Sequence, residues 1–128
     1  AAPLTNSAKL GILHGSAAYV CQNNEGQIND TASISAGLDY PGVSPIHCFL
    51  KDTKRARYTS ATDENALNAY KLVTKLEKIN PSLEPSHAFA ESIKIAPKLS
   101  KDTIIVVNSC GDAKKDRDIL KERLGKIN

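Results

Sequence analysis

The sequence predicts an α/β fold class in which this chain supplies part of a three-layer domain built on a parallel sheet. The run "TIIVV" (103–107) contains five β-prone residues that a central parallel strand can bury on both faces. Segments with the spacing of amphipathic helices flank this run. A parallel sheet needs several strands joined by crossovers, and only one convincing central strand is present, at 103–108. We therefore expect a partial domain.

Residues 1–43 are predicted to form extended segments and a shaped loop. "LGILHGSAAYVCQNNEGQIND" reads as two extended segments joined by a turn at 23–26. "ISAGLDYPGVSP" carries two glycines and two prolines, which indicates a loop of defined shape.

Residues 44–128 are predicted to form helices around the strand at 103–108. Ser44 and Pro45 begin a short helix that runs through Leu50. A brief strand is expected at 56–61 ("ARYTSA").

The clearest helix begins at Thr62, a capping residue followed by two acids, and is stopped by Asn80-Pro81. Its buried stripe is expected to contain Ala66, Ala69, Tyr70, Val73 and Leu76. A further helix is expected from near Glu84 to the residue before Pro97, and a last one from about 115 to 124, ended by glycine.

Composition and charge exclude several functional classes. No apolar run approaches the roughly 20 residues that span a bilayer, and the first residues lack the features of a signal peptide, so we expect no membrane and a cytoplasmic location. The net charge is +3, and the basic cluster at 51–57 is interrupted by Asp52, so we expect no nucleic acid partner. The cysteines and histidines lack the spacing of a metal site or a disulfide framework.

Four segments in the same order resemble the C-terminal portion of the tryptophan synthase beta subunit. They are "SISAGLDYPGVSPIHCFLKDT", "SATDENALNAYKL", "PSLEPSHAFAESIKIAPKL" and "IIVVNSCGDAKKD". The resemblance implies a fold-type II enzyme that uses pyridoxal 5'-phosphate (PLP) to replace the hydroxyl of L-serine with indole, giving L-tryptophan. It also implies a monovalent cation (Na⁺ or K⁺), an alpha subunit and a second beta subunit as partners.

Two motifs of that family are absent from the sequence. The family holds PLP on the lysine of a His-Lys-x-Asn motif and its phosphate on a loop like GGGSNA, and neither occurs here. We therefore expect the isolated chain to be inactive. The alternatives are another fold-type II eliminase, similar to threonine synthase or serine dehydratase, and a non-catalytic structural or oligomerising module.

The resemblance implies a cofactor role for Cys110 and Gly111. Cys110 falls where the family usually has a serine that faces the pyridine nitrogen of PLP. A small buried hydrophobe is the alternative interpretation of this cysteine. Glu84 matches a glutamate near the cofactor ring, and Lys115 matches its ion-pair partner.

The resemblance also gives roles to residues of the first 43. Asp39 matches an aspartate that senses the serine hydroxyl when the site closes, although the sequence alone favours a turn residue before Tyr40-Pro41. Gly37, Tyr40 and Gly42 match positions whose backbone carbonyls bind the monovalent cation. Leu13 and His14 fall where the family lines its indole tunnel, and core packing is the alternative there.

One stretch departs from the family's pattern. The family commonly reads Ser-Gly-Arg-Gly-Asp-Lys-Asp where this chain reads "CGDAKKD". Asp112 reverses the charge of the arginine, and Ala113 replaces a more permissive glycine. The geometry of this loop and its communication with an alpha subunit are expected to differ.

Overall fold

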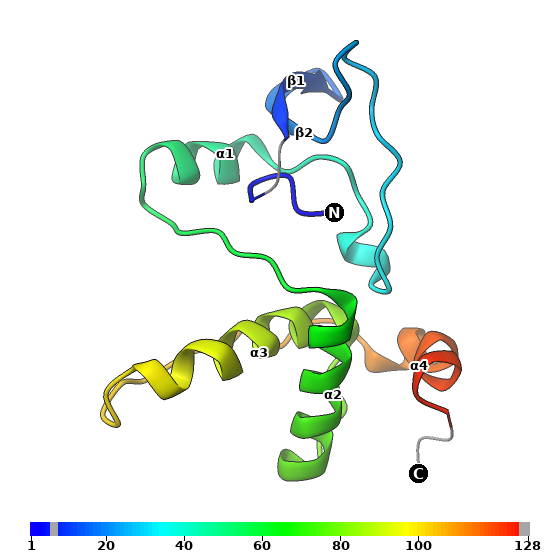
Figure 1. Ribbon diagram of the computed structural model, residues 1–128, viewed down its shortest axis with the longest axis vertical. Helices are drawn as coiled ribbons and strands as arrows, with labels where there is room; N and C mark the ends of the chain where they lie inside the picture. The colour runs from blue at the N-terminus through cyan, green and yellow to red at the C-terminus, as the bar shows by residue number, and fades with distance from the viewer. Residues whose placement is uncertain (6–7, 126–128) are drawn as a thin grey trace. The chain divides into compact units, whose positions relative to one another are not determined.

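The computed structural model describes residues 1–5 and 8–125. It divides into two compact units, an N-terminal unit (1–60) and a C-terminal unit (61–128). Helices and strands both occur, so the expected mixture of α and β elements is confirmed (Figure 1). The sheet of the described residues is a two-stranded antiparallel one, and the predicted parallel sheet is not found among them.

The N-terminal unit begins with a β-hairpin. Strand β1 (Lys9–Leu13) pairs antiparallel with β2 (Ser16–Val20), and Leu13 lies opposite Ser16. The connecting residues His14 and Gly15 both have positive φ, 51° and 75°, as a two-residue type I′ turn requires. The sequence does not predict this turn, because His-Gly lacks the Asn-Gly or Asp-Gly signal of a type I′ turn.

The predicted turn at 23–26 is also present. Gln22 and Ile28 form an antiparallel bridge across it. The Asn23 side chain accepts hydrogen bonds from the backbone N–H groups of Glu25 (3.0 Å) and Gln27 (2.9 Å). An asparagine that bonds its own downstream backbone in this way holds the turn closed.

A helix packs on β2 and closes the core of the N-terminal unit. Helix α1 (Pro45–Asp52) begins at Ser44, whose hydroxyl accepts a hydrogen bond from Ile46 N–H at 3.3 Å, so the predicted start is confirmed. The core of this unit includes the buried residues Leu4, Ala18 and Cys48. A short 3₁₀ helix, η1 (Ala36–Leu38), precedes α1. The strand predicted at 56–61 is wrong, since those residues are irregular and pair with no strand among the described residues.

The C-terminal unit is built on two packed helices, α2 (Asp63–Glu77) and α3 (Leu83–Ile95). Thr62 and Asn65 cap α2 reciprocally, each side chain accepting from the other residue's backbone N–H. The helix ends at Lys78, which is left-handed with φ 60°. The predicted stripe is buried at Ala66, Ala69, Tyr70 and Val73, whereas Leu76 near the helix end is 63% exposed.

The chain after α3 returns along the C-terminal unit to a last helix. A 3₁₀ turn, η2 (Ala96–Lys98), follows α3. Another, η3 (Ala113–Asp116), leads into α4 (Arg117–Leu124), which ends at Gly125 as predicted.

The predicted central strand at 103–108 is not formed. These residues are irregular, and Ile104 and Val106 are 87% and 90% exposed. A strand exists only where a neighbour supplies hydrogen-bonding partners, and the described residues provide no neighbour for this segment.

Candidate functional site

Glu84 and Lys115, the two residues that the family resemblance pairs, come together at the start of α3. The Lys115 ammonium donates a hydrogen bond to Glu84 Oε1. Its nitrogen also lies 3.6 Å from Asp116 Oδ1. Glu84 stands in the first turn of α3, where the helix dipole favours an anion. We call Ser82, Glu84, Cys110, Gly111, Lys115 and Asp116 the α3–loop cluster.

The ion pair shifts the titration of Lys115. The hydrogen bond to Glu84 raises the pKa of the Lys115 ammonium, with a smaller contribution from the charge of Asp116, while partial burial opposes the shift. The ammonium therefore stays charged beside the carboxylates over the whole neutral range.

Cys110 and Gly111 form an exposed corner of the same cluster. Cys110 is exposed in this chain. Gly111 has φ 85°, which favours glycine, and a Cβ there would lie 2.6 Å from Ser82 Oγ and 3.9 Å from Glu84 Oε2. The absence of a side chain at Gly111 lets the corner approach the start of α3.

Two residues of this cluster were missed from the sequence. Ser82 Oγ donates a hydrogen bond to the Cys110 carbonyl oxygen at 2.8 Å, and Asp116 Oδ2 accepts one from Leu83 N–H at 2.7 Å. Ser82 and Asp116 are 2% and 4% exposed. The only signal in the sequence was two short polar residues, each beside a predicted helix start.

In the N-terminal unit, the hairpin turn lies against the loop that follows η1. The rings of His14 and Tyr40 stack with centroids 6.1 Å apart and planes at 15°. A Cβ on Gly42 would lie 2.5 Å from Leu13 Cδ2, so glycine is required for this close approach. The four predicted residues Leu13, His14, Tyr40 and Gly42 therefore form one hairpin–loop cluster.

The other two predicted residues of this unit lie just before that loop. Gly37 is in η1, and Asp39 follows it with its backbone N–H bonded to Ala36 O at 3.4 Å. The side chain of Asp39 is exposed. Pro41 is held to the end of β2, because its carbonyl accepts from Cys21 N–H at 2.7 Å.

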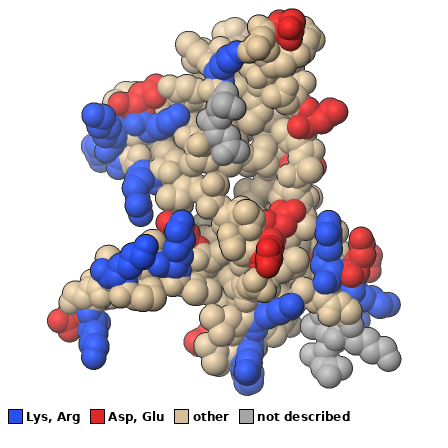
Figure 2. All heavy atoms as spheres, viewed as in Figure 1, with Lys and Arg blue, Asp and Glu red and all other residues tan. Residues whose placement is uncertain are grey.

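The basic cluster at 51–57 covers the end of α1 and the loop that follows it. Figure 2 shows Lys and Arg side chains gathered there. Lys51 Nζ lies 4.2 Å from the centroid of the Tyr19 ring. The Tyr19 hydroxyl donates to Asp52 Oδ1 at 2.9 Å, and this bond to the carboxylate raises the pKa of Tyr19. Lys51 and Asp52 of this cluster therefore contact Tyr19 within the N-terminal unit.

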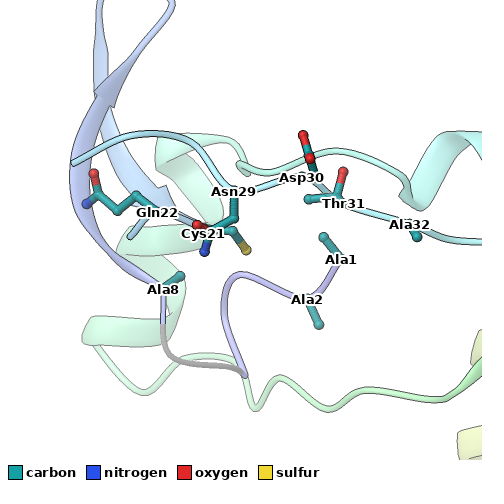
Figure 3. A pocket seen from close by; sticks show the side chains of 9 residues that line it. All are labelled: Ala1, Ala2, Ala8, Cys21, Gln22, Asn29, Asp30, Thr31 and Ala32. Atoms are coloured by element: carbon teal, nitrogen blue, oxygen red, sulfur yellow. The ribbon is translucent and has the colours of Figure 1, made fainter. Parts of the chain in front are cut away.

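A cavity of about 290 Å³ opens in the N-terminal unit (Figure 3). It is lined by Ala1, Ala2, Ala8, Cys21, Gln22, Asn29, Asp30, Thr31 and Ala32. None of the residues predicted for the site lines it. Among residues 1–5 and 8–125, no group of three or more histidine, cysteine or acidic side chains is arranged to hold a metal. No helix in the same residues has the length and apolarity to cross a membrane.

The mixture of helices and strands is consistent with a part of a larger α/β protein, and curated proteins show which family it resembles. The chain is 50% identical over 119 residues to the tryptophan synthase beta chain of Bordetella petrii, covering 93% of this chain and 30% of that protein. It is 52% identical over 116 residues to that of Chromobacterium violaceum (91% and 29%) and 54% identical over 115 residues to that of Cereibacter sphaeroides (90% and 28%). No protein-family model matches.

The predicted resemblance is confirmed: the chain is a relative of tryptophan synthase beta chains and matches their C-terminal portion. It spans about 30% of the length of the curated relatives.

Proposed function

We propose that this chain acts as the C-terminal portion of a tryptophan synthase beta subunit of PLP fold type II, which joins L-serine and indole to give L-tryptophan. About half of the aligned residues are identical to those of tryptophan synthase beta chains, which supports this reaction. The observation that carries the proposal is the α3–loop cluster, where the exposed Cys110 adjoins Gly111, whose Cβ position lies 3.9 Å from Glu84 of the Glu84–Lys115 pair.

The residues of the cluster fit the ring side of PLP. When bound, PLP withdraws electrons from the amino acid attached to it. The Cys110 thiol can donate one weak hydrogen bond, which suits a pyridine nitrogen that carries no proton. The ammonium of Lys115 would offset the negative charge of Glu84 near the ring and so weaken its effect on that nitrogen.

The hairpin–loop cluster fits the substrate side. Leu13 and His14 offer an apolar and an aromatic surface to indole, and the stacking on Tyr40 fixes the imidazole ring. The exposed Asp39 carboxylate can accept a hydrogen bond from the hydroxyl of serine. The backbone carbonyls of Gly37, Tyr40 and Gly42 would hold a monovalent cation, Na⁺ or K⁺.

The remainder of the subunit would complete the fold. The apolar segment 103–107, exposed here, would become a buried strand when neighbouring strands pair with it. The alpha subunit and a second beta subunit would be the protein partners, in the cytoplasm.

A chimera tests the proposal. Residues 8–125 would replace the matching segment of the Bordetella petrii beta chain, and tryptophan formation from L-serine and indole would be measured. We expect the chimera to bind PLP and to be active, and Cys110→Ser to keep that activity. Cys110→Asp should lose most of it, because a carboxylate favours a protonated pyridine nitrogen.

A chimera that folds and binds PLP but makes no tryptophan would contradict the proposal. Turnover of threonine derivatives or deamination of serine instead would favour the other eliminases. A chimera that forms oligomers but shows no enzymatic activity would favour a structural or oligomerising module.

A further inference from the structure

Two hydrogen bonds tie the start of α3 to both ends of the segment 110–116. At one end, Ser82 Oγ donates to Cys110 O at 2.8 Å, and at the other, Leu83 N–H donates to Asp116 Oδ2 at 2.7 Å. The two donors are adjacent in sequence, whereas the two acceptors belong to the first and the last residue of the segment 110–116. Ser82, Leu83 and Asp116 are buried, at 2%, 0% and 4% exposure. Burial protects the Leu83–Asp116 bond from competition with water, whereas the Ser82–Cys110 bond is half-buried.

Ser82 is used differently from an ordinary helix cap. It occupies the N-cap position of α3, yet its side chain makes no capping hydrogen bond to that helix. The free first-turn N–H of Leu83 is satisfied by Asp116 instead, from 33 residues away. The Ser82 hydroxyl is thereby available to hold the Cys110 carbonyl.

The fit between Ser82 and the corner is close. A side chain at Gly111 would meet Ser82 Oγ, so the corner can lie against Ser82 only because residue 111 is glycine. Next to the second tie, Lys115 reaches Glu84 in the first turn of α3. The two ties thus set where Cys110 and Lys115 stand relative to Glu84.

We propose that Ser82 and Asp116 are positioning residues that together fix Cys110 and Lys115 against the first turn of α3. The part of this inference that concerns PLP rests on the proposed function. The part that concerns the geometry does not, so the two can be tested separately.

The first measurement uses the 128-residue chain without cofactor. NMR titration of the Lys115 side chain would follow the Lys115–Glu84 pair in wild type, Ser82→Ala, Ser82→Thr and Ser92→Ala. Ser92 is the matched control, because its hydroxyl bonds Ala88 O in the same helix at 3.0 Å. We expect Ser82→Ala to lower the raised pKa of Lys115 toward its ordinary value. Ser82→Thr, which keeps the hydroxyl, and the control Ser92→Ala should both leave the pKa of Lys115 as in wild type.

The second measurement follows hydrogen exchange at the Leu83 amide. Asp116→Ala should speed this exchange about 10-fold, the scale of one lost buried hydrogen bond. Asp116→Asn keeps an oxygen acceptor and should keep most of the protection, and the exposed Asp118→Ala should keep all of it. The asparagine variant keeps the test decisive if the alanine variant does not fold.

The third measurement places Ser82→Ala in the chimera. We expect kcat for tryptophan formation to fall about 2- to 10-fold with KM for serine little changed, and Ser82→Thr to restore it, on the scale of one hydrogen bond. An unchanged Lys115 pKa in Ser82→Ala, or an equal change in Ser92→Ala, overturns the positioning role. A shifted pKa in a chimera that is inactive even before substitution leaves the positioning role standing and overturns the proposed function.

Discussion

Lys115 and Glu84 are 31 residues apart in sequence and form an ion pair in the C-terminal unit. This contact brings the start of α3 and the segment before α4 together around one charge pair. Its side chains are 41% and 18% exposed, so solvent screens it and its contribution to stability is expected to be modest, about 0.2–1 kcal/mol.

The pair predicts how stability depends on alkaline pH. The folded state raises the pKa of Lys115 above its ordinary 10.5, so the stabilisation is fully present below that value and is lost as the pH rises through the raised one. The difference in unfolding free energy between wild type and Lys115→Gln should be constant from pH 7 to about 10 and shrink above it. Urea unfolding at several pH values measures it, with the neighbouring Lys114→Gln as control. A difference that does not change with pH would contradict the role of the charge.

Tyr19 gives a second, independent titration in the N-terminal unit. Its hydroxyl donates to Asp52, and the carboxylate raises the pKa of Tyr19 above the ordinary 10.0. Asp52→Asn should bring the Tyr19 pKa back toward that value, because the amide carries no charge. Ultraviolet absorbance of tyrosinate would follow the titration, and Tyr19→Phe identifies which of the four tyrosines is responsible. Identical titration curves for wild type and Asp52→Asn would rule out the hydrogen bond.

Gly111 predicts a substitution effect that separates backbone strain from a steric clash. Gly111→Ala adds a Cβ at positive φ and also places it 2.6 Å from Ser82 Oγ, whereas Gly125→Ala adds one at φ 75° in open space. Both should cost the strain of a positive φ, about 1–3 kcal/mol, and Gly111→Ala should cost more because of the clash with Ser82. Urea unfolding of the C-terminal unit compares them. Equal losses would mean that Ser82 moves aside freely.

Much of the helical part of the fold could be predicted from the sequence because its signals are local. Ser44 before Pro45, and Thr62 before two acids, each begin a helix where predicted, and the stripe from Ala66 to Val73 is buried. These patterns need only neighbouring residues to act. The pair of Glu84 and Lys115 was expected from the family resemblance and is present.

The other features of the fold depend on contacts between distant residues, which local sequence patterns do not predict. The hairpin turn at His14 relies on a positive φ that the strands impose. The buried Asp116 bonds Leu83, which lies 33 residues away, and the local sequence around either residue does not indicate this contact. The strand at 103–108 failed for a different reason, because apolar β-prone residues form a strand only when a neighbour pairs with them.

The exposed side chains of segment 103–107 give the last prediction. Ile104 and Val106 are 87% and 90% exposed, so Ile104→Thr with Val106→Thr removes no buried contact in this chain. The unfolding free energy of the chain should change by no more than about 0.5 kcal/mol. Binding of an apolar fluorescent dye should fall, since less apolar surface faces the solvent. Leu120→Ala is the matched control: Leu120 is 2% exposed, and its truncation should cost about 2–5 kcal/mol.

The same double substitution should behave in the opposite way in the chimera with the Bordetella petrii beta chain. If neighbouring strands bury this segment there, as proposed, two hydroxyls replace packed methyl groups, and the soluble yield and PLP content of the chimera should fall sharply. Normal yield and PLP content would show that the segment stays exposed in the complete subunit, and the proposed central strand would then be wrong. A large loss of stability in the isolated chain would instead mean that Ile104 and Val106 already have partners within it.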